Sequence, residues 1–162
     1  MKTSEVVFSE NQIIIIGIKS PLFTRIPLLV IGIIAILIPI AILILRGIEG
    51  SGFHFGFIIP ILVCASIAYF ILRTVLWNTF GKEIITFTKE GIIYQPDYKY
   101  FKGKEMVVYK SPDLQFSRHN KEKDSCLFTI DNEESSIENV LPISKYHLRK
   151  IQQEFDRYVA ND

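Results

Sequence analysis

The sequence predicts a membrane protein of the mixed α+β class: a two-helix transmembrane hairpin, then a small antiparallel β domain capped by a C-terminal α-helix. Two apolar runs, at residues 26–45 and about 53–72, are each long enough to cross a bilayer core of about 30 Å as a helix. Short β-prone segments separated by turn residues follow from residue 78 onward. Residues 144–160 instead repeat apolar side chains at helical spacing.

The segment before the first run, residues 1–21, is expected to form one or two strands. Residues 5–8 and 12–18 are apolar and β-branched, with a polar turn between them. The alternative is that the second of these segments extends the membrane helix, but Gly17 and Pro21 interrupt such a helix. The sequence leaves open whether this segment joins the sheet of the C-terminal domain.

The hairpin is assigned to residues 22–77. Neither apolar run contains Asp, Glu, Lys or Arg, and His54 lies at the outer edge of the second. The connector between them is rich in glycine, which suits a tight turn. Pro27, Pro39 and Pro60 leave a re-entrant hairpin as the alternative to two complete spans. Small residues in both runs are candidates for helix packing, within the hairpin or between copies; they are Gly32, Ala35, Ser66 and Ala68.

Basic residues near the span ends predict the orientation of the hairpin. Lys19 and Arg25 precede the first run and Arg73 and Lys82 follow the second, whereas the connector carries only Arg46. We therefore expect a multi-pass protein of the cytoplasmic (inner) membrane with both termini in the cytoplasm. The first run is too long for a signal peptide and is expected to remain as an anchor.

Residues 78–162 have the composition of a soluble domain. They are expected to hold six strands, at residues 83–88, 92–95, 106–109, 114–118, 126–130 and 137–141. Residues 89–91 predict a tight hairpin turn in which Gly91 adopts a positive φ, and residues 119–124 predict a charged turn. Ser144 is expected to cap the final helix, whose apolar stripe includes Leu148, Ile151 and Phe155.

Composition and the lack of catalytic motifs argue against several classes of function. Residues 78–162 carry 13 Lys or Arg and 14 Asp or Glu, a balance that argues against nucleic acid as a partner. Cys64 and Cys126 lie in different parts of the chain and are not expected to form a disulfide. The chain has no nucleophile elbow, phosphate loop, paired-cysteine motif or metal-ligand spacing. We expect no catalytic residue, no metal and no cofactor, and therefore no enzyme.

The order of the elements carries a family resemblance over roughly residues 22–160. A strand, the turn Glu90-Gly91-Ile92 and a second strand follow two apolar helices, and a terminal helix begins after Leu141-Pro142-Ile143-Ser144. This order resembles bacterial membrane proteins that carry a pleckstrin-homology-like (PH-like) domain beside a two-helix anchor. The resemblance implies a scaffold or binding module and not an enzyme. A full barrel of that kind needs one strand more than the six expected, which residues 13–18 could supply.

Two groups of residues are candidate contact sites. Residues 94–104 mix aromatic and basic side chains, as a loop on a membrane surface would, where each lysine gains roughly 1 kcal/mol beside anionic lipid; an ordinary solvated hairpin is the alternative. A second basic turn, near residue 120, is interleaved with acidic residues, which favours a solvated turn. The lipid- or partner-binding candidates are Tyr94, Tyr98, Lys99, Tyr100, Phe101, Lys102, Lys104, Arg118 and Lys121.

The sequence therefore predicts a non-enzymatic module anchored in the inner membrane. Its domain is expected to bind a protein partner, the lipid surface or further copies of itself as a homo-oligomer. A membrane-embedded immunity or accessory subunit, which would recognise its partner through the hairpin, is the first alternative. An enzyme acting on lipid through Asp97, Asp113, His119 or His147 is the second.

Overall fold

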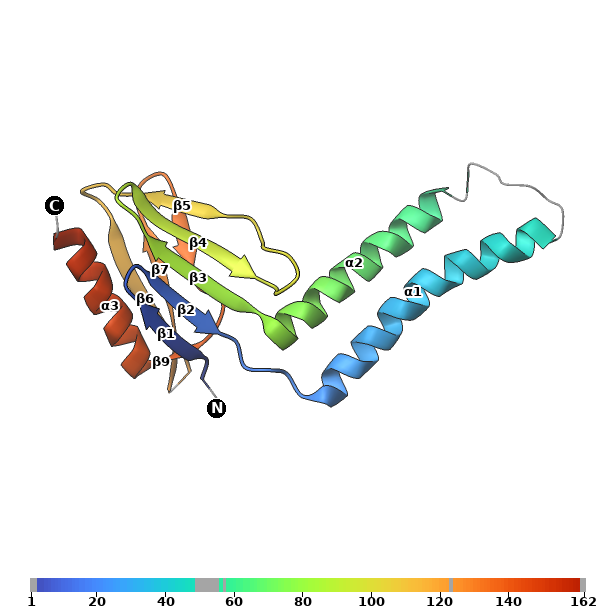
Figure 1. Cartoon of the computed structure of the whole chain (residues 1–162), viewed down its shortest axis with the longest axis horizontal. Helices are drawn as coiled ribbons and strands as arrows, with labels where there is room; N and C mark the ends of the chain where they lie inside the picture. The colour runs from blue at the N-terminus through green and yellow to red at the C-terminus, as the bar shows by residue number, and fades with distance from the viewer. Residues whose placement is uncertain (1–2, 49–55, 57, 123, 161–162) are drawn as a thin grey trace. The chain divides into compact units, whose positions relative to one another are not determined.

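The structure is a computed structural model that describes residues 3–48, 56, 58–122 and 124–160 (Figure 1). The side chains of residues 120–122 are outside this description, as are His54 and most of the glycine-rich connector. The chain divides into two compact units. We call Ser20–Asn78 the helical unit, and Met1–Lys19 together with Thr79–Asp162 the β unit.

The helical unit contains α1 (Leu22–Ile48) and α2, which starts at Ile58 and ends at Phe80 just beyond this unit. Their 27 and 23 residues correspond to about 40 Å and about 35 Å of helix. Both helices are long and apolar enough to span a membrane. The helix α1 continues through Pro27 and Pro39. The predicted run at residues 53–72 begins outside the described residues, and α2 extends well beyond its end.

Five antiparallel strands form the first sheet of the β unit, in the order β1-β2-β3-β4-β5. These strands are β1 (Glu5–Ser9), β2 (Gln12–Ile16), β3 (Lys82–Phe87), β4 (Gly91–Asp97) and β5 (Met106–Tyr109). Strand β2 pairs with β3, with Ile13 opposite Ile85 and Ile15 opposite Glu83. The N-terminal segment thus joins the sheet of the C-terminal residues, which settles the question that the sequence left open.

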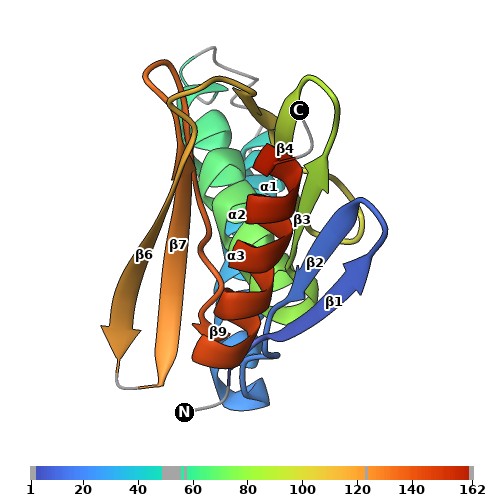
Figure 2. The same cartoon turned by 90° about the vertical axis from the view of Figure 1, so that its left-hand side faces the viewer.

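The second sheet contains the remaining strands, and α3 accompanies it. The strand β7 (Ser125–Asp131) lies between β6 (Gln115–Glu122) and β8 (Ser136–Glu138), and it also pairs with β9 (Ile143–Ser144). Figure 2 shows α3 (Lys145–Ala160) running between β6 and β7 on one side and β1 to β3 on the other.

The core of the β unit lies between these sheets and α3. Ile85 and Phe128, which point inward from the two sheets, are fully buried, and Leu148, Ile151 and Phe155 of α3 are buried in the same cluster. The predicted cap of α3 is confirmed, because the His147 amide donates a hydrogen bond to the Ser144 hydroxyl over 3.2 Å. The structure is therefore of the mixed α+β class, with antiparallel sheets and a C-terminal helix.

The predicted role of Gly91 in a turn was wrong. Gly91 does not adopt a positive φ; it begins β4 and lies directly against β5. A Cβ at this position would collide with the Val108 carbonyl oxygen and lie 2.9 Å from the Cα of Tyr109. The glycine is required by close backbone approach and not by a left-handed turn. Among described non-glycine residues, a positive φ occurs at Lys99, at 78°.

Three strand predictions also need correction. Strand β6 continues through residues 119–122, where a turn was predicted, because pairing with β7 satisfies the backbone despite the charged side chains. A register shift, typical of a β-bulge, lies between Asn120 and Glu122. The predicted strand 137–141 ends at Glu138, and the short strand β9 was not predicted at all. Seven strands, not six, therefore follow α2 in the described chain.

Candidate functional site

Residues 97–104, which we call the lysine loop, connect β4 to β5 and are held in a tight turn. The Lys99 amide donates to Asp97 Oδ1 over 2.7 Å, and the Tyr98 amide donates to the Phe101 carbonyl over 3.0 Å. The Gly103 amide donates to the Pro96 carbonyl over 2.7 Å. These hydrogen bonds fix the backbone of the loop, so its side chains project from a defined framework.

The aromatic residues of this region divide between core and surface. Tyr94 is buried in the core. Tyr98 is also buried and stacks on Phe101, with 4.6 Å between the ring centroids. Tyr100 is 70 % exposed and meets the edge of Phe80. Of the aromatic side chains predicted to contact a membrane or partner, Tyr100 is therefore the one on the surface.

The three lysines of the loop are all exposed. The ammonium group of Lys99 lies 4.4 Å from the centre of the Phe80 ring and 5.3 Å from that of Tyr100. Lys102 and Lys104 carry the same charge further along the loop. Phe80 is the last residue of α2. Lys99 and Tyr100 of the lysine loop therefore contact the residue at which this helix ends.

The second basic group is separate from this loop. Arg118 is exposed on β6, in the other sheet, and the side chain of Lys121 lies outside the described residues. The two groups therefore do not form one continuous site through any contact in the described chain. Of these two groups, the lysine loop is the one in which the structure records a basic side chain against aromatic rings.

The small residues predicted to pack in the helical unit have different surroundings. Gly32 and Ala68 are buried, Ala35 is half-buried and Ser66 is exposed. A Cβ added to Gly32 would lie 3.1 Å from Ile71 Cγ2, so glycine permits close approach of α1 and α2. The Ser66 hydroxyl donates to the Leu62 carbonyl of its own helix over 2.8 Å.

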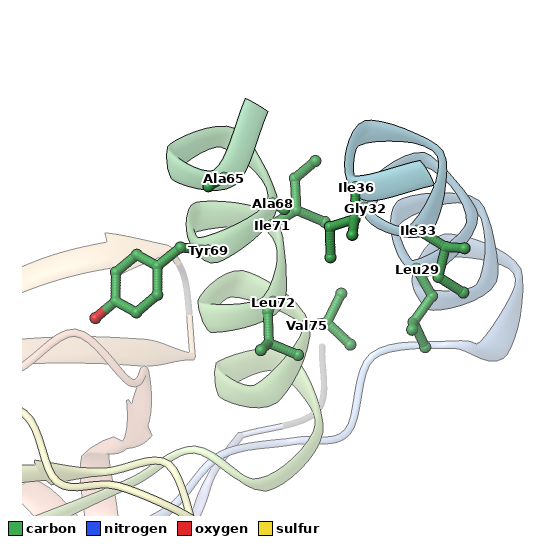
Figure 3. Close-up of a pocket in the computed structure, with 10 residues that line it drawn as sticks. All are labelled: Leu29, Gly32, Ile33, Ile36, Ala65, Ala68, Tyr69, Ile71, Leu72 and Val75. Carbon is green, nitrogen blue, oxygen red and sulfur yellow. The ribbon is translucent and has the colours of Figure 1, made fainter. Parts of the chain in front are cut away.

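An apolar groove of about 480 Å³ runs between α1 and α2 (Figure 3). Apart from Tyr69, which points away from α1, its lining carries no polar side chain. A smaller groove of about 130 Å³ shares Ile36 and Ala65 with it. The larger groove is lined by Leu29, Gly32, Ile33, Ile36, Ala65, Ala68, Tyr69, Ile71, Leu72 and Val75.

Glu83 is the polar residue that the sequence prediction missed. It lies on β3 in the core of the β unit and is fully buried. Its Oε1 atom accepts hydrogen bonds from the Tyr94 hydroxyl at 2.9 Å, from the Val140 amide at 2.7 Å and from the Leu141 amide at 3.2 Å. The alternation of β3 contained a usable signal, because Glu83 has the same parity as the buried Ile85.

Three of the four residues considered for lipid chemistry, Asp97, Asp113 and His147, make hydrogen bonds within the β unit. Asp113 accepts a hydrogen bond from the Glu133 amide at 2.7 Å, and contacts with Ser111 and this amide lower the pKa of its carboxyl. His147 hydrogen-bonds to Ser144 at the start of α3, and Asp97 holds the lysine loop. His119 is exposed on β6. Within the described residues, no three His, Cys, Asp or Glu side chains are grouped to hold a metal ion.

Comparison of the chain with protein-family models finds no match, and comparison with curated proteins finds none either.

Proposed function

We propose that the chain is a non-enzymatic binding module of the inner membrane. In this proposal α1 and α2 cross the bilayer, both termini lie in the cytoplasm, and the β unit presents its lysine loop to the anionic lipid surface. The observation that carries the proposal is the exposure of apolar side chains along both helices.

Large apolar side chains are exposed on all sides of α1 and at many positions along α2. Leu37 of α1 is 56 % exposed, and Leu62 and Phe70 of α2 are 60 % and 62 % exposed. In water such surface is costly, at roughly 25 cal/mol per Å², whereas in lipid it is solvated. A hydrocarbon solvent is therefore the surrounding that fits both helices.

Position and charge support the lysine loop as the lipid-facing part of the β unit. Phe80, which contacts Lys99 and Tyr100, follows Trp77 by three residues at the end of α2. Tryptophan and tyrosine favour the headgroup level of a bilayer, and lysine is attracted to anionic headgroups. If α2 spans the membrane, its end brings the loop to this level without a separate targeting step.

We propose further that the β unit has a PH-like fold. Two antiparallel sheets and a terminal helix that enters the core through Ile151 and Phe155 support it. A binding role fits such a scaffold, since its loops and sheet edges are available to partners.

Labelling of single cysteines tests the topology. In a variant with Cys64→Ala and Cys126→Ala, Ser51→Cys reports the connector and Lys145→Cys reports the start of α3. We expect an impermeant thiol reagent to label residue 51 on intact cells and residue 145 only after the membrane is permeabilised. Labelling of both positions from the same side would contradict the two-span topology. In a separate test, extraction of the chain from membranes by alkaline carbonate would contradict its insertion into the bilayer.

Fluorescence quenching tests the lipid contact. The full chain with Trp77→Phe and Tyr100→Trp is placed in nanodiscs that contain headgroup quenchers, with or without anionic lipid. We expect quenching that depends on anionic lipid and weakens with salt, because the attraction is electrostatic. Lys99→Gln, Lys102→Gln and Lys104→Gln together should abolish this dependence.

The matched control removes three exposed cations elsewhere, through Arg118→Gln, Lys145→Gln and Arg149→Gln. This control should retain the quenching. Equal quenching in both triple variants would show that net charge, and not the lysine loop, is responsible.

The groove favours a second candidate function, that of an accessory or immunity subunit. In that case α1 and α2 recognise a transmembrane helix of a protein partner in the groove between them. Small residues such as Gly32 and Ala65 along the groove suit close helix contact.

Two neighbouring residues of α2 separate this candidate from the first. Ala65 lines the groove, whereas the adjacent Ser66 is not among its lining residues. Ala65→Leu should abolish co-purification of a membrane partner and Ser66→Leu should not. If neither substitution changes co-purification or phenotype, the groove is not the functional surface.

A further inference from the structure

Glu83 occupies a position where a charged residue is unexpected. It faces the core of the β unit, opposite Ile15 of β2 and Pro96 of β4, and two residues before the fully buried Ile85. Its Oε1 atom accepts all three of the hydrogen bonds described above, while its Oε2 atom is buried without a hydrogen-bond partner. A buried carboxyl oxygen with no donor strongly disfavours the ionised form of the group.

The two amides that donate to Glu83 belong to residues 139–142, which we call the clasp segment. This segment connects β8 to β9 in the second sheet. Asn139 fixes its beginning: the side-chain oxygen accepts from the Phe128 amide at 2.6 Å, and the side-chain nitrogen donates to the Leu141 carbonyl at 2.6 Å. Glu83 therefore links the first sheet to the second through side chain and backbone.

The clasp segment also contacts the ends of the β unit that lead to the helices. The Ser4 amide donates to the Pro142 carbonyl over 3.0 Å. The side chain of Leu141 packs against Gly17, where an added Cβ would lie 3.1 Å from Leu141 Cδ2. The Gly17 amide donates to the Gly81 carbonyl over 2.9 Å. Release of the clasp segment would thus loosen the place where the chain leaves β2 and enters β3.

Among the residues that the structure describes, no positive charge contributes to the pKa of Glu83. From β4 the facing ionisable group is the Tyr94 phenol, with Tyr98 further along; β2 contributes Ile15, and the clasp segment contributes Asn139 and backbone amides. Burial raises the pKa of Glu83 from 4.5 to about 7, against the opposing effect of its hydrogen bonds. Burial also raises the pKa of Tyr94, so the phenol remains a neutral donor.

We propose that Glu83 is a proton-binding switch that holds the clasp segment on the first sheet when protonated and releases it when ionised. In the protonated state the carboxyl is neutral and the core stays dry. Loss of the proton leaves a buried negative charge with one unsolvated oxygen. The nearest way to solvate that oxygen is for water to enter as the clasp segment moves away.

Hydrogen exchange of the full-length chain in nanodiscs tests this switch. The probe is the protection of the Val140 and Leu141 amides, corrected for the intrinsic pH dependence of exchange, between about pH 5 and about pH 9. We expect protection to fall by at least about tenfold across this range in the natural sequence. The Ile92 and Val108 amides of the β4–β5 ladder serve as the internal reference and should not change.

Two variants distinguish titration of Glu83 from a general loosening of the β unit. Glu83→Gln preserves the size of the side chain and cannot ionise, so its protection at residues 140–141 should be independent of pH. Tyr94→Phe removes a donor that favours the charged form, so the midpoint of the change should move to higher pH. Protection that is constant in the natural sequence would overturn the proposal. An unchanged midpoint in Tyr94→Phe would do so too, even if Glu83→Gln failed to fold.

Discussion

The helices α1 and α3 are both built around apolar residues but place them in opposite surroundings. In α3, Leu148, Ile151 and Phe155 form a stripe that is buried against the sheets. In α1, whose whole length is described, Gly32 is the only buried residue. A helix with one apolar stripe can be stabilised by its own protein core, whereas a helix that is apolar all round needs apolar surroundings. The chain itself therefore completes the core of the β unit, whereas the helical unit depends on its surroundings.

The largest expected effect comes from truncating an apolar residue in each unit. Phe128 is fully buried and stacks on Phe116, so Phe128→Ala should lower the free energy of unfolding by about 3–5 kcal/mol. Leu37 is exposed on α1, so Leu37→Ala in detergent should cost less than about 1 kcal/mol. Denaturant titrations of the full chain in micelles measure both, followed by hydrogen exchange in β7 for Phe128→Ala and in α1 for Leu37→Ala. Equal losses would mean that Leu37 is packed against protein.

The next effect is a pH dependence confined to the β unit. Because the pKa of Glu83 is about 7 when folded and 4.5 when unfolded, only the folded state holds the proton between these values. The free energy of unfolding should therefore fall as the pH rises from 4.5 to about 7, by about 3 kcal/mol in total, and this contribution should be constant above that range.

The control for this dependence is Glu83→Gln, which has no proton to lose at this position. Subtracting its pH profile from that of the natural sequence isolates the contribution of Glu83. A difference that rises with pH would mean that the carboxylate is stabilised in the fold, contrary to its burial.

The smallest expected changes in the free energy of unfolding come from two serines, one at the start of α3 in the β unit and one within α2 in the helical unit. Ser144 caps α3, so Ser144→Ala should cost about 1 kcal/mol because the His147 amide loses its acceptor. Ser66 only donates back to Leu62 within α2, so Ser66→Ala should stay within about 0.5 kcal/mol of zero. Thermal unfolding of the two variants side by side provides the measurement. A loss at Ser66 as large as that at Ser144 would place Ser66 at a contact between copies.

Elements with a strong local pattern could be predicted from the sequence. The strand at Met106–Tyr109 and the cap at Ser144 agree with their prediction, and the two helices contain the predicted apolar positions that the structure describes. Gly91 could not be predicted in this way, because its requirement arises from the β5 backbone and not from its own turn.

The candidate site was predicted only in part for the same reason. The exposed lysines of the loop follow from composition, but the burial of Tyr94 depends on Glu83 and on amides 57 and 58 residues further along the chain. No local pattern records which aromatic side chain will find such a partner. Tyr94 is buried and Tyr100 is 70 % exposed, although both were predicted to contact a membrane or a partner.

Strands β2 and β3 are neighbours in the first sheet, although the helical unit separates them in the sequence. Ile16 lies opposite Lys82, so the whole helical unit is inserted between two neighbouring antiparallel strands, at the place where an ordinary hairpin has its turn. In topological terms the helical unit is a loop of a β-meander. Replacing residues 20–78 by a short turn would therefore preserve the order of β1 to β5 and the register of β2 against β3.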